Sequence, residues 1–422
     1  MPDLGLIVVD EEHDSSYKQE SAPRYNARDV AVVRARMLGI PILLGSATPS
    51  LESIHNVRQG KYRHVEMPRR VTSHDLPIVM VIPLSGAFYR PDGTGLITEE
   101  LDYLIRKRLE TREQILLFLN RRGFETFLHC TRCGHVLKCP HCDITLTYHR
   151  AQNCLRCHYC GHGQAVVADC PECSTPGLRR AGVGTEKISA EIARRYPEAR
   201  VARLDRDTAS SHQAMRRTIG NFARGDYDIL VGTQMVAKGH DFPRVTLVGI
   251  INADTGLHFP DFRAAERTYQ ILTQVAGRAG RGELAGRVVI QTFFPDHFAV
   301  RAAASGDFTT FVQKELEYRK TLGYPPFGRL VKILCQGESA EDVEAEASRC
   351  ASLLREKAPG ARILGPAPSP IEKIQNKRRF QILLKSSSPA ALHAALVALE
   401  AEAPRSKSGV DRIVDVDPQS ML

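Results

Sequence analysis

Cysteine spacing constrains the fold of this chain more than any other feature of its sequence. Nine of the eleven cysteines fall between Cys130 and Cys173, and eight of these nine form four CxxC pairs. Turn residues such as Gly134 and Pro140 stand beside the pairs. Closely spaced thiols of this kind are typical of tetrahedral zinc sites, with an iron–sulfur cluster or free thiols as the alternatives. Since two pairs complete one site, the pattern predicts two zinc ions in a cysteine-rich insertion.

The order of the pairs favours a nested arrangement of the two zinc sites. The middle pairs have the separation that is usual in a zinc ribbon, which leaves the outer pairs to close the base of the insertion. Cys154 also has CxxC spacing to Cys157 and is an alternative ligand for the inner site. The predicted inner ligands are Cys139, Cys142, Cys157 and Cys160, and the predicted outer ligands are Cys130, Cys133, Cys170 and Cys173.

Length and charge bound the class of protein. With 422 residues and a mass of 46.8 kDa, the chain has room for about two to four domains. Its net charge of +9 favours a polyanionic partner. No apolar run approaches the roughly 20 residues of a membrane span, and the first residues have neither a basic leader nor a cleavage site. We therefore expect a cytoplasmic protein that does not contact a membrane.

The chain opens with an apolar strand that ends in acidic residues. Leu4–Val9 is followed by the sequence DEEH, which begins with Asp10 and Glu11. A carboxylate at a strand end can hold magnesium through water, and the next carboxylate can orient an attacking water. The alternative is a solvated acidic turn. Tyr17 and Lys18 then combine aromatic and basic character, as in a loop that contacts single-stranded DNA or, alternatively, in an ordinary amphipathic surface.

Two further apolar strands end in polar residues. Ile229–Val231 leads into Gly-Thr-Gln, and Val245–Ile251 leads to Asn252 and Asp254. Ligands bind beyond the carboxyl ends of the strands in open α/β folds. These endings therefore predict a ligand site at this edge of a parallel sheet.

A helix that begins at Ala264 leads into the sequence QVAGRAGR, which contains Arg278 and Arg281. Two arginines three residues apart lie on one face if the helix continues. Their forked, permanently charged side chains can bind a phosphate that is held by a neighbouring lobe. The alternative is a surface loop rich in glycine and arginine.

The remaining apolar segments predict the order of elements around these sites. In the first part we expect a helix at Ala27–Leu38 and a strand at Pro41–Leu44. The sequence GSATP follows at 45–49, and a short strand is expected at Tyr62–Val65. A linker follows at 67–97, then a helix from about Thr98 and a strand at Ile115–Asn120. Arg121 and Arg122 come directly after that strand, where they can contact a phosphate backbone.

The carboxyl-terminal part alternates strands and helices in the order βαββαβ, which predicts a small split βαβ sandwich. Lys377, Arg378 and Arg379 fall in its central hairpin. They predict either a DNA-binding surface or a solvated face that keeps the domain soluble.

Several motifs together resemble a known family. The sequences GTQMVAKGHDF, ADTG and QVAGRAGR resemble motifs V, Va and VI of superfamily 2 helicases. The sequences DEEH, SAT and LFLNRRGF resemble motifs II, III and IV. With the four CxxC pairs, the chain resembles the PriA family of primosomal replication-restart DNA helicases over essentially its whole length. The resemblance also keeps Cys157 and Cys160 as ligands, which makes Cys154 a spectator.

The resemblance implies an ATP-dependent DNA helicase of 3′ to 5′ polarity that binds stalled or branched replication forks and initiates primosome assembly. The implied partners are branched and single-stranded DNA, single-strand-binding protein and primosome proteins, and the implied state is a monomer. Asp10 and Glu11 would serve magnesium and water, and Arg278 and Arg281 would reach the γ-phosphate. The implied nucleotide-site residues are Asp10, Glu12, His13, Gly239, Asp254, Gln274, Arg278 and Arg281.

The expected fold class is α/β, with RecA-like helicase lobes, a two-zinc insertion and a βαββαβ domain. The expected divisions are a partial first lobe (1–66), a linker (67–97), a second lobe (98–129 and 176–297), a zinc-binding insertion (130–175) and a carboxyl-terminal domain that binds DNA and partners (298–422).

The phosphate-binding P-loop is missing from this pattern, because GxxxxGK[ST] occurs nowhere in the sequence. The family carries that loop before DEEH, so we expect a truncated chain that does not hydrolyse ATP alone. Either Met1 is a misassigned start or the chain is a remnant. The rival function is a non-enzymatic, zinc-containing DNA-binding adaptor. A related double-strand translocase is a third reading, against which the two-zinc insertion argues.

Overall fold

The computed structural model describes most of the chain. The described residues are 3–67, 77–84, 95–120, 127–149, 152–176, 178–180, 185–205, 208, 211–237, 242–280, 284–402 and 409–421. Among these residues, no helix has both the length and the apolar character needed to span a membrane.

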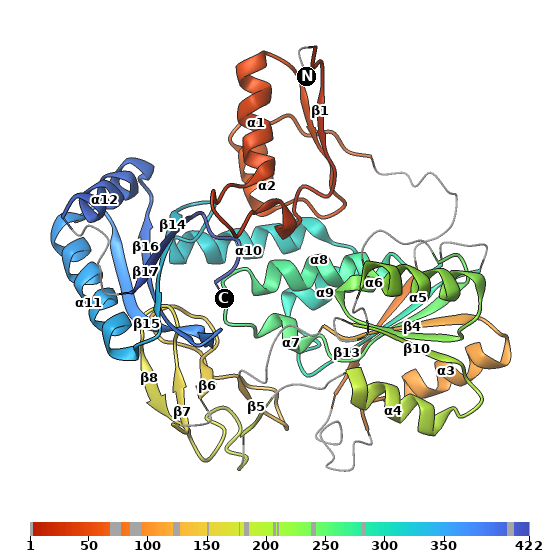
Figure 1. The fold of residues 1–422 in the computed structure, drawn as a ribbon. Coiled ribbons are helices and arrows are strands. Elements are labelled where there is room, and N and C mark those ends of the chain that lie inside the picture. The colour runs from red at the N-terminus through yellow and green to blue at the C-terminus, as the bar shows by residue number, and fades with distance from the viewer. Residues whose placement is uncertain are drawn as a thin grey trace.

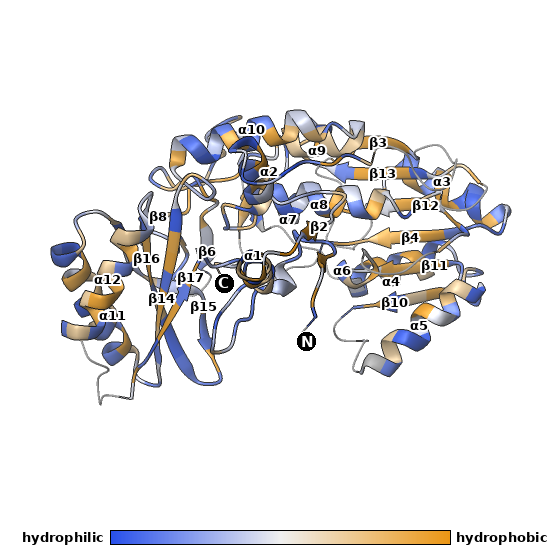
Figure 2. Ribbon diagram, turned by 90° about the horizontal axis from the view of Figure 1, so that it is seen from above, coloured by the Kyte–Doolittle hydropathy of each residue, from blue (hydrophilic) through white to orange (hydrophobic). Residues whose placement is uncertain are grey.

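A parallel sheet forms the core of the second lobe, which lies on the right in Figure 1. The strand order in the described residues is β10-β11-β4-β12-β13-β3. Every residue of β4 and β12 is buried, because these apolar runs are covered on both faces. Figure 2 shows β4 in orange at the centre of this sheet. The strands are β3 (Ile78–Pro83), β4 (Gln114–Phe118), β10 (Val201–Leu204), β11 (Ile229–Gly232), β12 (Val245–Ile250) and β13 (Arg287–Thr292).

Helices cover both faces of this sheet. One apolar core lies between the sheet and α3 and α4, and the other lies between the sheet and α5, α8 and α9. Alternate residues of β4 enter the two cores, with Leu116 in one and Leu117 in the other. The helices are α3 (Glu99–Glu110), α4 (Thr185–Arg195), α5 (His212–Arg224), α6 (Gln234–Ala237), α7 (Asp254–Leu257), α8 (Ala264–Ala276) and α9 (Phe298–Ser305).

The edge strand β3 falls inside the segment that we predicted as a linker, residues 67–97. It pairs in parallel with β13, from Ile78 opposite Arg287 to Pro83 opposite Thr292. Its two end residues are exposed and the four between them are half-buried, as expected for a strand at the edge of a sheet, and its apolar run is short.

The first-lobe fragment, at the top of Figure 1, consists of a two-stranded parallel sheet with two helices. The predicted helix Ala27–Leu38 is confirmed as α1, which Asn26 caps and Gly39 ends with a φ of 65°. The predicted strand Tyr62–Val65 is not formed. The remaining elements are β1 (Ile7–Val9), β2 (Ile42–Leu44), the 3-10 helix η1 (Ser15–Tyr17) and α2 (Leu51–Arg58).

The cysteine-rich insertion is built from short antiparallel strands. β5 (Leu128–Cys130) and β9 (Leu178–Arg180) pair at its base. β6 (Thr147–His149), β7 (Cys154–Arg156) and β8 (Gly163–Ala165) form a three-stranded sheet. In Figure 1 the insertion lies below the carboxyl-terminal domain.

The predicted βαββαβ order of the carboxyl-terminal domain is confirmed. Its four strands form one antiparallel sheet in the order β15-β16-β14-β17, with α11 and α12 packed against it. Helix α10 (Phe308–Leu322) connects this domain to the second lobe. The elements are β14 (Arg329–Gly337), α11 (Ala340–Lys357), β15 (Arg362–Ile374), β16 (Lys377–Ser386), α12 (Pro389–Glu402) and β17 (Asp411–Val416).

Candidate functional site

The DEEH sequence forms a tight turn at the end of β1. Asp10 and Glu11 are exposed, and the Glu11 amide donates to Asp10 Oδ1 over 2.9 Å. Glu11 has a φ of 46°, in the left-handed region that residues other than glycine rarely adopt. Gly45 of the GSATP sequence lies beside Asp10, because a Cβ on Gly45 would be 3.8 Å from Asp10 Oδ1. The two carboxylates that we predicted for magnesium and water are therefore accessible to solvent.

Glu12 has a different environment from its two acidic neighbours. It is 2% exposed and accepts hydrogen bonds from the Ser50 amide (2.6 Å), the Ser53 hydroxyl (2.9 Å) and Arg28 Nη1 (3.0 Å). Ser50 is the N-cap of α2, so Glu12 holds the start of that helix against the DEEH turn. We predicted Glu12 as a nucleotide contact, but the structure places its carboxylate in these internal bonds.

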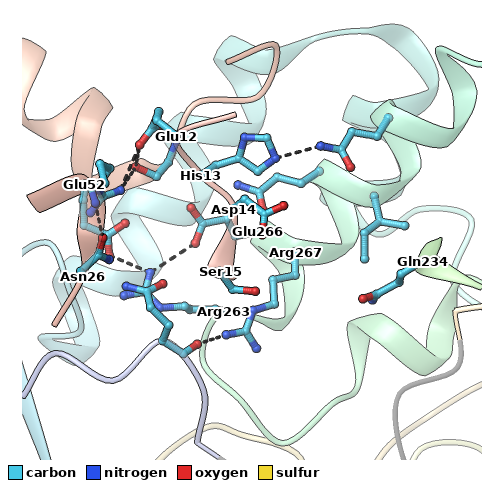
Figure 3. A pocket seen from close by; sticks show the side chains of 16 residues that line it. Glu12, His13, Asp14, Ser15, Asn26, Glu52, Gln234, Arg263, Glu266 and Arg267 are labelled. Carbon is cyan, nitrogen blue, oxygen red and sulfur yellow. Dashed lines mark hydrogen bonds and ion pairs between the residues drawn. The ribbon is translucent and has the colours of Figure 1, made fainter. Parts of the chain in front are cut away.

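His13 joins three of the predicted motifs. Its Nδ1 lies 2.6 Å from Ser46 Oγ, and its Nε2 lies 2.9 Å from Gln274 Nε2 on α8. The Gln274 amide nitrogen donates to His13 Nε2, and in the matching tautomer His13 Nδ1–H donates to the Ser46 hydroxyl oxygen. Figure 3 shows His13 reaching from the first-lobe fragment to α8. The structure thus brings together His13 and Gln274, which the sequence separates by 261 residues.

Helix α8 does not extend to Arg278. Helix α8 ends at Ala276, and half-buried Arg278 lies in the turn that follows. Gly280 has a φ of 66°, and a Cβ there would be 2.6 Å from the Gly286 amide nitrogen, so this turn closes too tightly to continue a helix. The helix that we expected to continue through Arg278 therefore ends before it.

Four predicted site residues lie outside the described part of the chain. They are Arg281 and Gly239 of the nucleotide site, and Arg121 and Arg122 of the DNA-binding prediction.

Asp254 is directed into the second lobe. It is 4% exposed and accepts hydrogen bonds from the Thr292 hydroxyl and, over 2.8 Å, from the Phe293 amide. Burial raises the pKa of Asp254 to about 6, although these donors lower it. The Asp254 carboxylate is therefore bonded inside the second lobe, to residues at the end of β13. We had predicted Asp254 as a residue that shapes the nucleotide site.

A polar pocket lies between the first-lobe fragment and α8 (Figure 3). Arginines face carboxylates within it, and Arg263 Nη1 lies 2.7 Å from Glu52 Oε1. Burial alone would raise the pKa of Glu52, but nearby arginines lower it to about 2. The lining residues are Glu12, His13, Asp14, Ser15, Asn26, Arg28, Ser50, Glu52, Gln234, Arg263, Glu266, Arg267, Gln270, Ile271, Gln274 and Gln419.

A buried charge network behind this pocket was not predicted from the sequence. Arg319, on α10, is fully buried and binds Glu266 (2.7 Å) and Glu315 (3.0 Å). Glu266 also accepts the Leu51 amide at the start of α2 over 3.0 Å. The i,i+4 spacing of Glu315 and Arg319 in the sequence indicates an ion pair between them. Their contact with Glu266, about 50 residues earlier, has no such signal in the local sequence.

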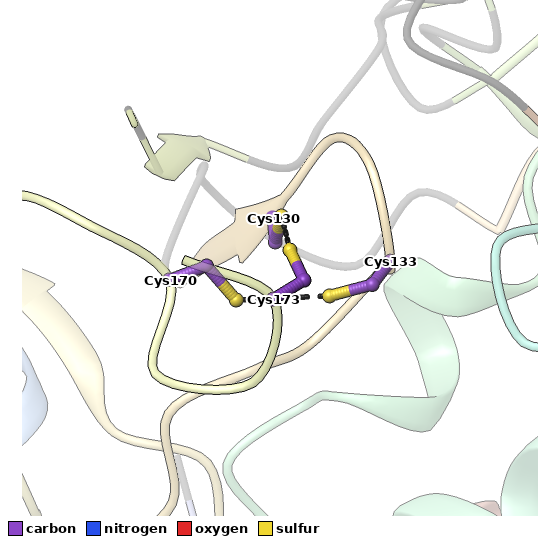
Figure 4. Close-up of side chains that lie close together, drawn as sticks. All are labelled: Cys130, Cys133, Cys170 and Cys173. Atoms are coloured by element: carbon purple, nitrogen blue, oxygen red, sulfur yellow. Dashed lines mark hydrogen bonds between the residues drawn. The ribbon is translucent and has the colours of Figure 1, made fainter. Parts of the chain in front are cut away.

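The cysteine sulfurs form the two groups of four that the nested spacing predicts. In each group, all four Sγ atoms lie within 4.8 Å of one another, and Cys154 belongs to neither group. The Cys130–Cys173 and Cys133–Cys170 sulfurs, drawn in Figure 4, are 3.6 Å apart. A tetrahedron with zinc–sulfur bonds of about 2.3 Å has edges of roughly 3.8 Å, so this spacing fits zinc. It is far too long for a disulfide.

Each CxxC pair has the same turn geometry. The residue four positions after the first cysteine has a positive φ, and its amide donates to that cysteine's carbonyl over 2.8 to 2.9 Å. Two of these turns use glycine, for which this backbone region is easily accessible. The four residues are Gly134 (79°), Asp143 (52°), Gly161 (82°) and Ser174 (54°). The backbone therefore presents each thiol pair towards one point.

The inner cysteine group is docked on two other parts of the chain. Tyr324, which follows α10, donates from its hydroxyl to the Cys142 carbonyl over 3.2 Å. His158 Nδ1 bonds the Pro368 carbonyl on β15, and Gln381 on β16 donates to the His158 carbonyl, both over 2.7 Å. The insertion is thus fixed to the carboxyl-terminal domain, and the Phe262 amide of the second lobe also donates to the Tyr159 hydroxyl of the insertion over 3.3 Å.

The basic hairpin of the carboxyl-terminal domain is less open than its sequence indicates. Lys377 pairs with Asp411 over 2.7 Å, and Arg379 donates to the Ile371 carbonyl over 3.3 Å. Burial also lowers the pKa of Arg379. Arg378 is exposed and remains the most accessible of the three predicted DNA contacts.

Comparison with known proteins agrees with these features. Family models match residues 320–419 (Primosomal protein N C-terminal domain), 139–164 (PriA DNA helicase Cys-rich region domain) and 180–283 (Helicase conserved C-terminal domain). The chain is similar to the replication restart protein PriA of Bacillus subtilis, with 43% identity over 93% of this chain and 49% of that protein. It is also similar to the PriA proteins of Haemophilus influenzae, with 41% identity over 99% of this chain and 57% of that protein, and of Treponema pallidum, with 41% identity over 99% of this chain and 63% of that protein.

This chain spans about half the length of the curated relatives that it matches. Among solved structures, yeast Dbp5 bound to RNA and ADP BeF3 overlaps 76% of this chain and 62% of that chain with 12% identity and a TM-score of 0.38.

Proposed function

Because this chain belongs to the PriA family of replication restart proteins, we propose that it acts as part of an ATP-dependent DNA helicase of 3′ to 5′ polarity. Its substrates would be branched replication forks and single-stranded DNA. Its partners would be single-strand-binding protein and the proteins of the primosome, in the cytoplasm, with this protein as a monomer.

The position of His13 is the observation that supports this proposal most directly. A motor of this kind works only if groups on two lobes act on one nucleotide, because phosphoryl transfer depends on positioning and charge stabilisation. His13 contacts Ser46 in its own lobe and Gln274 in the other, at 2.6 and 2.9 Å. The DEEH turn therefore contacts the QVAGRAGR segment through His13 and Gln274, as a shared site between the lobes requires.

The proposed roles in nucleotide hydrolysis follow from exposure and sequence position. Asp10 and Glu11, exposed at the end of β1, would hold magnesium through water and orient the attacking water. Magnesium, when bound, neutralises charge on the β- and γ-phosphates. Arg278, which follows α8, and Arg281 would donate to the γ-phosphate from the second lobe. Gly239 would contribute to the same nucleotide site.

We further propose that this chain does not hydrolyse ATP without an added P-loop. Its 422 residues contain no GxxxxGK[ST] sequence, so the amides and the lysine that usually fix the phosphates are not supplied by this chain. Each charge-assisted hydrogen bond of that kind is worth about 1.5 to 3 kcal/mol, so the loss of several would leave nucleotide binding very weak.

The two cysteine groups would each hold one zinc ion. The inner ligands would be Cys139, Cys142, Cys157 and Cys160, and the outer ligands would be Cys130, Cys133, Cys170 and Cys173. Zinc, when bound, supplies a tetrahedral cross-link, and a site with four thiolates leaves no open position for catalysis.

DNA-stimulated ATP hydrolysis tests the proposal. We expect no stimulated turnover from this chain and measurable turnover from a version extended at its amino end by a first-lobe segment that carries a GxxxxGK[ST] sequence. The same extended version with Arg278→Ala should lose that turnover. Turnover by the unextended chain that depends on Arg278 would show that the P-loop argument is wrong. DNA binding without turnover in the extended version would favour the non-enzymatic adaptor.

A further inference from the structure

The last strand of the carboxyl-terminal domain contacts the loop that follows DEEH. Lys18 Nζ donates to the Val416 carbonyl over 2.7 Å and pairs with Asp415 Oδ1 over 2.8 Å. The exposed fraction of the Lys18 side chain is 6%, and that of Asp415 is 15%. This ion pair is therefore largely shielded from water and from salt. The structure places Lys18 in a contact between domains, where the sequence predicted a contact with DNA.

Residues 415–421, which we call the carboxyl-terminal strap, continue from this pair across the second lobe. The Arg267 guanidinium on α8 donates to the Gln419 carbonyl. Met421 is 1% exposed and packs in an apolar cluster with Phe262 and Tyr324. Figure 1 shows the carboxyl end of the chain at the centre of the molecule, near α8, where Arg267 binds Gln419. The strap is therefore anchored at both ends, at Lys18 and at Met421.

The loop that Lys18 occupies is also bonded to the DEEH turn. The Tyr17 hydroxyl donates to the Asp10 carbonyl over 2.6 Å. The Gln19 amide donates to the Tyr25 carbonyl over 2.9 Å, which closes the loop on itself. One peptide bond thus separates the residue that contacts the strap from the residue that contacts Asp10. A movement of the loop backbone at Lys18 would therefore also shift Tyr17.

We infer that the strap holds the loop of residues 14–26 in a DNA-free conformation, and that DNA phosphates compete with Asp415 for Lys18. Lys18 binds a carboxylate oxygen of Asp415 and the carbonyl oxygen of Val416. A phosphate oxygen is also a hydrogen-bond acceptor for an ammonium group. A shielded ammonium cannot bind a phosphate without leaving the strap. DNA binding at this loop therefore releases the strap and shifts Tyr17, which alters the support of Asp10. The competition rests on the proposed function, whereas the strap contact does not.

Hydrogen exchange of the full, zinc-loaded chain tests the strap without DNA. Lys18→Met and Asp415→Asn should each speed exchange of the amides in residues 15–26 by about tenfold, because each removes a shielded charged hydrogen bond. Asp411→Asn is the matched control, since it breaks the exposed Lys377 pair on the same strand. Exchange in 15–26 that is unchanged in both variants, or equally changed in the control, would overturn the strap.

A single-stranded oligonucleotide tests the competition. In the unmodified protein, DNA should speed exchange in residues 411–421, and in Lys18→Met it should cause no further change there. DNA that binds the unmodified protein and leaves 411–421 protected overturns the competition. An absence of any DNA binding contradicts both the competition and the proposed function, and the DNA-free comparison then decides the strap separately.

Discussion

The buried network around Glu266 leads to a strong prediction about stability. Replacing Glu266 with Ala removes a carboxylate that binds fully buried Arg319 (2.7 Å) and accepts the Leu51 amide (3.0 Å). Arg319 would keep Glu315 but lose its second anion. Breaking a buried ion pair on one side costs about 3 to 5 kcal/mol, and the remaining Glu315 pair puts the expected loss near the lower end of that range. In a domain of about 150 to 250 residues, the size range of the second lobe, 1 kcal/mol shifts Tm by about 2 to 4 °C. We therefore expect Tm to fall by roughly 10 °C.

Thermal unfolding at constant zinc content measures this effect. The control is Glu317→Ala, at an exposed position on α10, the helix that carries Arg319. It should shift Tm by no more than about 2 °C. Arg319→Met should destabilise the protein by a similar amount to Glu266→Ala. The double variant should lose less than the sum of the two, because the residues share one interaction. Additive losses, or a Glu266→Ala shift as small as that of the control, would refute the reasoning.

Three further predictions concern zinc, DNA and pH. Metal analysis should find two zinc ions per chain, with both kept in Cys154→Ser and one lost in Cys157→Ser, since the Cys154 sulfur belongs to neither group. Arg378→Ala should lower the slope of log affinity for DNA against log salt by about one unit, and Lys377→Ala by less because Asp411 already neutralises it. Burial raises the pKa of Asp254 to about 6, so its contribution favours folding at pH 4 and is lost as pH rises through about 6. Asp254→Asn should remove about 2 kcal/mol of that pH dependence in unfolding measurements between pH 4 and pH 7.

Elements with strong local signals could be predicted from the sequence. Helix α1 has Asn26 as its N-cap and Gly39 as its C-cap, and its bounds match the prediction. The four turns of the cysteine insertion also follow local rules, and their spacing identified the same two groups that the sulfurs form. Where the pattern was short, the prediction failed. Strand β3 has six residues at a sheet edge, and its pairing with β13 depends on residues about 200 positions away.

Contacts between distant segments could not be predicted, because charge and exposure depend on what packs against a residue. Lys18 belongs to a basic and aromatic loop in the sequence, but Asp415 covers it in the structure. Lys377 and Arg379 each have a partner in the structure, whereas Arg378 is exposed, although the three residues are consecutive. A run of basic residues therefore predicts a charge balance, and only the fold decides which ammonium or guanidinium groups a phosphate can reach.

Helix α8 shows what a closer sequence analysis could have found. Arg263, Glu266, Gln270 and Gln274 recur at intervals of three or four residues, so they form one polar stripe facing the pocket. A polar stripe usually faces water, but Arg263, Glu266 and Gln270 are each less than 9% exposed. A buried polar stripe must find partners, because unpaired polar groups are costly to bury. The partners come from the first-lobe fragment and α10, and the same helix leads directly to Arg278. The position of α8, and of Arg278 after it, is therefore set jointly by the first-lobe fragment and α10.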